Sequence, residues 1–122
     1  MNVEPQVAQD GEQLRVIVVD DHALFRHALR GALELGGFDV CADVELGEQA
    51  LAATLEHKPH VVLMDQRLPD LSGPAATRLI LAEAPLFEAG VLYPYKVLRP
   101  LRLHRMEHFA IMSLLTRPQQ GW

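Results

Sequence analysis

Residues 61–73, VVLMDQRLPDLSG, decide the fold because they read as a buried strand that ends in a carboxylate. Four apolar residues, two of them β-branched, precede Asp65, and a turn that contains Pro69 and Gly73 follows. A short continuous apolar run bounded by turn residues is typical of a strand covered on both faces. The stretch therefore predicts a buried parallel strand with Asp65 at its carboxyl end.

Strands and helices alternate on both sides of this stretch. We expect strands over residues 14–19, 38–43 and 60–64, and helices over residues 22–36, 47–57 and 73–83. Gly36-Gly37, Lys58-Pro59 and Pro85 provide the stop signals of the helices. The spacing of apolar residues predicts the buried helix faces, which comprise Leu24, Phe25, Ala28, Leu29, Ala32 and Leu33, then Ala50, Leu51, Thr54 and Leu55, then Ala75, Ala76, Leu79 and Ile80. This alternation predicts βαβ units and an α/β fold.

Composition predicts one soluble globular domain. The chain has 122 residues, 49% of them hydrophobic, and contains one cysteine, Cys41, which cannot pair within the chain. The acidic N-terminal residues do not resemble a signal peptide, and no apolar run is long enough to span a membrane. We therefore expect a cytoplasmic protein without membrane contact.

Charge is distributed unevenly. Residues 1–86 hold six Lys and Arg against 14 Asp and Glu, whereas residues 87–122 hold five against two. A basic tail can mark a nucleic-acid interface, but this tail carries no recognisable binding motif. We therefore expect a solvated helix face and no contact with DNA by this chain.

Three acids stand at the predicted ends of two strands. Asp20 and Asp21 follow the strand at 14–19, and Asp65 follows the strand at 60–64. Ligands of open α/β sheets bind at the carboxyl ends of the strands. A structural alternative is that the acid pair caps the helix that begins near His22, but Asp65 precedes Gly73 by eight positions and caps no helix. Clustered carboxylates repel one another unless a cation joins them, so the sequence predicts a Mg²⁺ site.

The segments VIVVDDHALFR, residues 16–26, and LMDQRLPDLSG, residues 63–73, resemble the receiver domain of bacterial response regulators in two-component systems. The DDHALFR variant is most similar to the subfamily whose output is a LuxR-type helix-turn-helix domain. The strong resemblance covers residues 14–85, and a weak one covers residues 87–100. It implies a flavodoxin-like, doubly wound parallel sheet.

The resemblance also implies roles for individual residues. Asp65 would be the phosphoacceptor, Asp21 would bind Mg²⁺ directly, and Asp20 would help through water. The backbone carbonyl of Arg67 would supply a further ligand. The phosphoryl donor implied by the family is a phosphohistidine on a sensor histidine kinase, and the receiver itself is not an enzyme.

The second half of the chain departs from the family pattern. Receivers also use a Ser or Thr at the end of a fourth strand and a Lys at the end of a fifth, and Lys96 is the candidate for that Lys. However, Lys96 follows Asp65 by only 31 residues, which leaves no room for one strand and one helix. Ser72 and Thr77 belong to the third helix and cannot replace the missing hydroxyl, whereas Ser113 and Thr116 follow too late in the chain.

Two arrangements follow from this shortening. In one, a strand over residues 91–96 lies beside the third strand, which gives four strands in the order 2-1-3-4. In the other, a second copy of the chain fills the gap, so a homodimer forms. A final helix is expected over residues 101–115, with Leu103, Met106, Ala110 and Leu114 inward. The domain would cover residues 14–116, between a flexible leader at 1–13 and a tail at 117–122 that is too short for an output domain.

The sequence thus predicts a single-domain receiver of a phosphorelay. The alternative is a degenerate receiver that acts as a phosphorylation-independent interaction module, which the missing Ser or Thr favours. An enzyme of the haloacid dehalogenase type is disfavoured because Arg67 occupies the second acidic position of that family's D-x-D motif. His104 and His108 are spaced for one helix face, but a zinc site would need further ligands.

Overall fold

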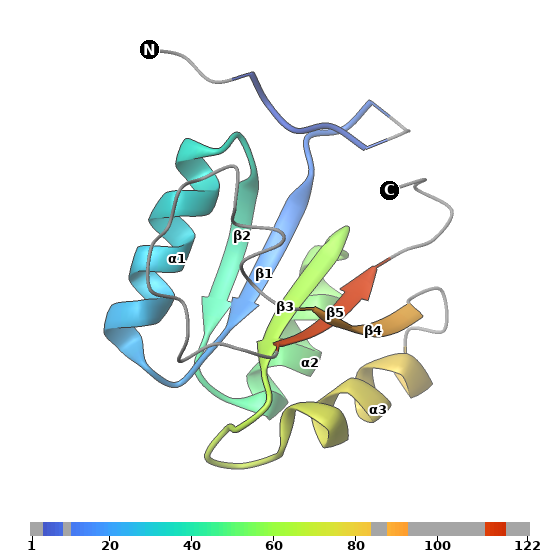
Figure 1. Ribbon diagram of the computed structural model, residues 1–122. Helices are drawn as coiled ribbons and strands as arrows, with labels where there is room; N and C mark the ends of the chain where they lie inside the picture. The colour runs from blue at the N-terminus through green and yellow to red at the C-terminus, as the bar shows by residue number, and fades with distance from the viewer. Residues whose placement is uncertain (1–3, 9–10, 84–87, 93–111, 117–122) are drawn as a thin grey trace.

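A computed structural model describes residues 4–8, 11–83, 88–92 and 112–116 of the chain. Strands and helices alternate through residue 83, as the sequence predicts, and two more strands follow (Figure 1). The elements are β1 Arg15–Val19, α1 Ala23–Leu35, β2 Asp39–Val44, α2 Gly47–His57, β3 Val61–Asp65, α3 Gly73–Glu83, β4 Glu88–Leu92 and β5 Met112–Thr116. Among the described residues, no helix is long and apolar enough to cross a bilayer.

The strands form one sheet in the order β2-β1-β3-β5-β4. β1 pairs in parallel with both β2 and β3, whereas β5 pairs antiparallel with β3 and with β4. The parallel half is the flavodoxin-like arrangement that was expected. Because β1 and β3 are parallel neighbours in the sheet, their carboxyl ends lie side by side.

Helices cover both faces of the parallel half (Figure 1). Alternate residues of a strand point to opposite faces, so the apolar runs of β1 and β3 supply two separate cores. One core lies beneath α1 and contains Val16, Val18, Leu29, Leu33, Val40 and Leu63. The other lies beneath α2 and α3 and contains Ile17, Val19, Ala50, Ala53, Val62, Met64, Ala76 and Ile80. Burial on both faces explains why these strands are uniformly apolar.

The buried stripe of each helix is narrower than the sequence predicted. Leu24, Leu55 and Leu79 were expected to face the core, but they are 86%, 45% and 43% exposed. Each is the chain neighbour of a residue that faces the sheet, and one residue turns a helix by roughly 100°. A single layer of sheet contacts only one side of a helix, so these leucines lie at or beyond the edge of the contact.

The sheet corrects the prediction of four strands in the order 2-1-3-4. β5, not a strand over residues 91–96, lies beside β3, and β4 ends at Leu92. The predicted helix over residues 101–115 is wrong at its end, because Met112–Thr116 form β5. A short apolar run suits a strand as well as a helix, and this one fills the open edge of β3. Residues 93–111, including Lys96, lie outside the described residues.

The segment before β1 contacts the turn after α1 through its backbone. The backbone N–H of Gln6 donates to the carbonyl of Gly37 at 2.8 Å, and Val7 bridges to Gln13. Gly37 has a φ of +93°, and a Cβ there would lie 2.4 Å from the carbonyl oxygen of Glu4. Gly37 therefore ends the turn after α1, and its lack of a side chain lets the segment before β1 pack closely against that turn.

Candidate functional site

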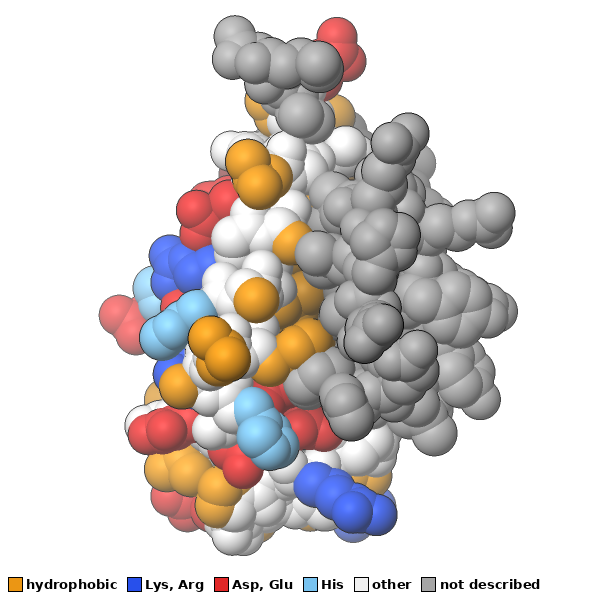
Figure 2. Space-filling view, turned by 60° about the vertical axis from the view of Figure 1, so that its left-hand side comes forward, with side chains coloured by type: hydrophobic (Ala, Val, Ile, Leu, Met, Phe, Trp, Pro, Cys, Tyr) orange, Lys and Arg blue, Asp and Glu red, His pale blue; other side chains and the backbone are white. Residues whose placement is uncertain are grey.

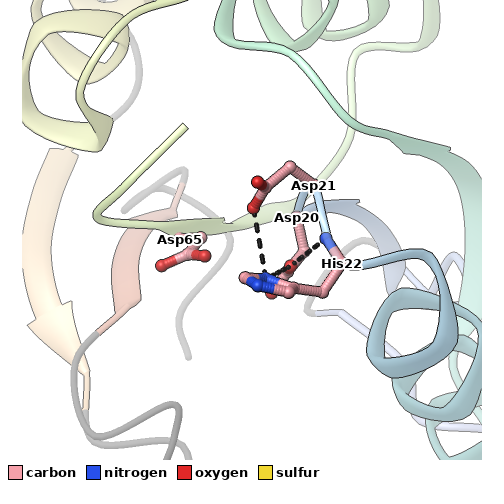
Figure 3. Close-up of side chains that lie close together, drawn as sticks. All are labelled: Asp20, Asp21, His22 and Asp65. Atoms are coloured by element: carbon pink, nitrogen blue, oxygen red, sulfur yellow. Dashed lines mark hydrogen bonds and ion pairs between the residues drawn. The ribbon is translucent and has the colours of Figure 1, made fainter. Parts of the chain in front are cut away.

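Four side chains with metal-binding atoms lie together at the carboxyl end of the parallel strands (Figure 3). Val19 and Met64 are register partners in β1 and β3, so the residues that follow them, Asp20 and Asp65, end side by side. Asp21 and His22 continue from Asp20 toward α1. The topology of a parallel sheet therefore brings together acids that are 45 positions apart in the chain.

The cluster is compact. Asp20, Asp21, His22 and Asp65 each offer one ligand atom, and these four atoms lie within 4.8 Å of one another. The three carboxylates are those predicted from the sequence. His22 was expected only as the start of a helix, and the structure adds it to the cluster.

The acid pair does not cap α1 in the usual way. The N-cap residue is His22, and its own side chain makes no capping hydrogen bond. Instead, the backbone N–H of His22 donates to Oδ1 of Asp20 at 2.8 Å. The other carboxylate oxygen of Asp20, Oδ2, is buried and has no hydrogen-bond partner among the described residues. Helix capping therefore does not account for the whole carboxylate.

Burial and mutual repulsion shape the titration of the cluster. Burial raises the pKa of Asp20 above its ordinary value, and the negative charge of Asp65 raises it further. Burial also raises the pKa of Asp65, with an added contribution from Asp21. Both carboxylates are thus ionised at a cost in free energy that a cation would remove.

Arg26, on the first turns of α1, fixes the backbone beneath the acid pair. Its guanidinium donates to the carbonyl oxygen of Asp20 at 2.8 Å and to Oδ1 of Asp43 at 2.9 Å. Arg30 binds the other oxygen of Asp43. Burial alone would raise the pKa of Asp43, but hydrogen bonds from Arg30 and Arg26 outweigh it and lower the pKa. The pair of arginines therefore connects α1 to both β1 and β2.

The loop after β3 turns back closely on Asp65. The backbone N–H of Arg67 points to Oδ1 of Asp65 at 3.3 Å, and that of Gly73 donates to the carbonyl of Gln66 at 2.8 Å. A Cβ on Gly73 would lie 2.3 Å from the carbonyl oxygen of Asp65. Only glycine fits at this position, which explains the glycine that ends the turn.

Asp70 connects the same loop to α2. Its two carboxylate oxygens accept hydrogen bonds from the backbone N–H groups of Gly47, at 2.8 Å, and Glu48, at 3.0 Å. Sequence reasoning did not assign this role. The available signal was Leu46, because a leucine at the N-cap position cannot accept a hydrogen bond and the first N–H groups of α2 need an external acceptor.

The remaining predicted residues have different outcomes. Ser72 accepts a hydrogen bond from the backbone N–H of Ala75 at 3.1 Å, in keeping with its expected place at the start of α3. The structure does not describe Lys96, and the role of the Arg67 carbonyl stays a prediction. Ser113 was expected to come too late in the chain, yet antiparallel β5 pairs it with Met64, while Met112 pairs with Asp65.

A doubly wound α/β domain with acids gathered at the ends of its central strands defines a class of ligand-binding and metal-binding modules. Within that class, residues 16–89 match the family model of the response regulator receiver domain, which is more than half of the chain. The chain belongs to this family and is a receiver domain of the two-component signalling type. Its acid cluster is typical of the Mg²⁺ site of such receivers.

Individual relatives agree with this assignment. The chain is 42% identical to a protein-glutamate methylesterase/protein-glutamine glutaminase of Haloarcula marismortui over 72 residues. That aligned region covers 59% of this chain and 20% of the other protein. The chain is 42% identical over 73 residues to the response regulator GacA of Pseudomonas protegens, which covers 59% of this chain and 34% of that protein. The crystal structure of a LuxR-family response regulator from Aurantimonas sp. SI85-9A1 matches with a TM-score of 0.58 at 32% identity, over 61% of this chain and 54% of that one. The chain therefore aligns with about a third or less of these two curated relatives.

Proposed function

We propose that the chain accepts a phosphoryl group on Asp65 from a phosphohistidine of a sensor histidine kinase, with Mg²⁺ as cofactor. The observation that carries the proposal is the convergence of Asp20, Asp21 and Asp65, whose ligand atoms lie within 4.8 Å of one another. The orphaned, buried Oδ2 of Asp20 fits the need for a cation. We place this receiver in the cytoplasm and in the subfamily related to LuxR-type regulators.

The carboxylates and the loop divide the work. Asp65 is the nucleophile: one carboxylate oxygen bonds to phosphorus as the P–N bond of phosphohistidine breaks and the imidazole recovers the electron pair. Asp21 and the carbonyl of Arg67 would hold Mg²⁺ directly, and Asp20 would hold it through water. When bound, Mg²⁺ neutralises charge on the carboxylates and the incoming phosphoryl oxygens. No general base is needed because the nucleophile reacts as an anion.

The N–H of Arg67 has a part in this chemistry. It points to Oδ1 of Asp65 at 3.3 Å, so it holds that carboxylate in one orientation at the end of β3. Orientation is worth much in phosphoryl transfer, where catalysis consists mainly of positioning and charge stabilisation. We assign Lys96 a contact to the phosphoryl oxygens after transfer, as the resemblance implies.

A second candidate function is a phosphorylation-independent interaction module. The observation that favours it is the pairing of Asp65 with Met112 of an antiparallel strand. The family pattern has a parallel strand there, with a Ser or Thr at its end that meets the phosphoryl group. A domain without that hydroxyl could keep its acid cluster and still lose its switch, and it would then act through protein contacts alone.

Phosphorylation in the absence of a kinase separates the two functions. The full chain would be incubated with acetyl phosphate and Mg²⁺, and its intact mass would be measured. We expect a single phosphoryl adduct that is absent from Asp65→Ala and absent when EDTA removes Mg²⁺. Asp39→Asn is the matched control, because Asp39 is an exposed acid at the other end of the sheet, and it should be labelled like the wild type. No adduct at saturating donor would favour the interaction module.

A further inference from the structure

The imidazole of His22 lies within the acid cluster and contacts two of its carboxylates. Its Nδ1 is 3.3 Å from Oδ1 of Asp20 and 3.2 Å from Oδ1 of Asp21 (Figure 3). Both carboxylates belong to the cluster, so Nδ1 is on the side of the ring that faces it. The nitrogen that could bind a metal is therefore directed at the other ligands.

The backbone holds His22 in this place. Its N–H donates to Asp20 at 2.8 Å, and its carbonyl accepts the N–H of Arg26 at 2.8 Å in the first turn of α1. The side chain is 70% exposed, so the ring can turn without disturbing the core. Figure 2 shows a histidine side chain at the surface among acidic side chains, on a face that also carries hydrophobic and basic side chains.

The separations suit one shared cation. Two ligands of a cation at roughly 2.1 Å are at most about 4.2 Å apart. The four atoms of the cluster lie within 4.8 Å of one another, so those of Asp21, Asp65 and His22 need only small shifts to share a cation that Asp20 reaches through water. Oδ2 of Asp20, on a side chain with no exposed surface, has no hydrogen-bond partner among the described residues, which is an observation separate from the spacing of the cluster.

We infer that His22 is an additional nitrogen ligand at this site, so that the site that takes Mg²⁺ in the proposed function binds Mn²⁺ and related transition ions more tightly. Mg²⁺ favours oxygen donors, whereas imidazole suits first-row transition metals, whose affinity for a nitrogen-containing site exceeds that of Mg²⁺. The inference rests on the proposed function only in using the same three carboxylates. It adds a ligand and a metal preference that oxygen donors alone would not provide.

Pulsed electron paramagnetic resonance of bound Mn²⁺ tests the inference directly. The untagged full chain would be loaded with less than one equivalent of Mn²⁺, without phosphodonor, and the coupling of ¹⁴N to the metal would be recorded. We expect the signature of a directly coordinated nitrogen in the wild type. It should be lost in His22→Gln and retained in His27→Gln, which removes an exposed histidine of the same helix. Mn²⁺ affinity in His22→Gln should fall about ten-fold, while Mg²⁺ affinity should change by less than about two-fold.

A second pair of variants identifies the site. Asp21→Asn should release Mn²⁺, whereas replacement of both His104 and His108 by Ala should leave the nitrogen signal intact. Bound Mn²⁺ without a coordinated nitrogen in the wild type, or an unchanged signal in His22→Gln, would overturn the inference. The proposed function would survive that result, because its test is the Mg²⁺-dependent adduct on Asp65. Failure of any cation to bind would overturn both.

Discussion

Arg26 donates a hydrogen bond to the backbone carbonyl of Asp20 at 2.8 Å, which makes α1 a direct support of the acid pair. The same guanidinium reaches Asp43 on β2, so one side chain connects a helix with two strands. Because its contact to Asp20 is to the backbone, Arg26 sets the position of the carboxylate without neutralising it by direct pairing. The cluster thus keeps its net negative charge available for a cation.

Replacement of Arg26 by Ala should both destabilise the domain and weaken metal binding. The change leaves the carbonyl of Asp20 and one oxygen of Asp43 without their donor, which we expect to cost about 1–3 kcal/mol. Urea unfolding with and without Mg²⁺ measures both effects. Arg78→Ala, at an exposed position of α3, should alter stability by less than about 0.5 kcal/mol. A loss of stability with unchanged Mg²⁺ affinity would show that Arg26 supports the fold alone.

Gly73→Ala should disrupt the site from the loop side. The added Cβ would meet backbone atoms, 2.3 Å from the carbonyl oxygen of Asp65 and 2.9 Å from the Cα of Gln66, so the end of β3 must move. We expect the free energy of unfolding to fall by about 2 kcal/mol or more, and phosphorylation of Asp65 to fall strongly. Thermal unfolding and adduct formation measure the two effects.

Gly31→Ala is the matched control for that change. Gly31 is an exposed residue within α1, and among the described residues a Cβ there meets nothing within 4 Å. Alanine should therefore stabilise the helix by roughly 0.5–1 kcal/mol. Equal behaviour of the two variants would contradict the role of the tight turn at Gly73.

Asp70→Ala should destabilise α2 although residue 70 is far from that helix in sequence. The change removes the acceptor for the N–H groups of Gly47 and Glu48, at a cost of about 1 kcal/mol. Although slight burial opposes it, donation from these N–H groups lowers the pKa of Asp70, so this stabilisation is present above the ordinary pKa and is lost as pH falls through the folded value. The variant should therefore be less stable than the wild type at pH 7, and the difference between their free energies of unfolding should shrink as pH falls below the ordinary value of 3.8.

The acid cluster should have the opposite pH dependence. Burial raises the pKa of Asp20 in the folded state, so its favourable contribution is complete below its ordinary value of 3.8 and is lost as pH rises through the folded pKa. With EDTA present, Asp20→Asn should therefore gain stability relative to the wild type as pH rises from 3.8 through the folded pKa of Asp20. Thermal melts across that range measure the difference, and Asp39→Asn is the control. A difference in stability between the two proteins that does not widen with pH would contradict the expected cost of ionising Asp20 in the folded state.

Saturation with Mg²⁺ should reverse that order at neutral pH. An ion at one hundred times its Kd stabilises the folded state by about 2.7 kcal/mol, and Asp20→Asn should forgo part of this gain. Asp20→Asn should therefore be the more stable protein in EDTA and the less stable one in saturating Mg²⁺. This reversal would show that the buried carboxylate of Asp20 destabilises the domain without a cation and stabilises it with one.

The first half of the fold was predictable from sequence because local signals agree there. Apolar runs, helical spacing and the Gly36-Gly37 stop place β1 to α3 within one or two residues, and α2 and α3 begin and end as predicted. Local signals conflict in the tail. Residues 112–115 read as the end of a helix, and only pairing with β3, between residues 47 to 55 positions apart in the chain, decides for a strand.

The same division applies to the site. Asp20, Asp21 and Asp65 were predictable because parallel strands bring their carboxyl ends to one edge. His22, Arg26 and Asp70 were missed because their partners depend on side-chain directions across elements, which periodicity does not report. The acceptorless N-cap at Leu46 was a usable clue to Asp70, whereas we find no comparable clue for Arg26.

The most direct test of the central claim is to locate the modified residue. After reaction with acetyl phosphate and Mg²⁺, borohydride would reduce an aspartyl phosphate to homoserine, and peptide mass spectrometry would identify its position. The account predicts homoserine at position 65 alone, and only in the presence of a divalent cation. Homoserine at another acid, or labelling that does not depend on the cation, would contradict it.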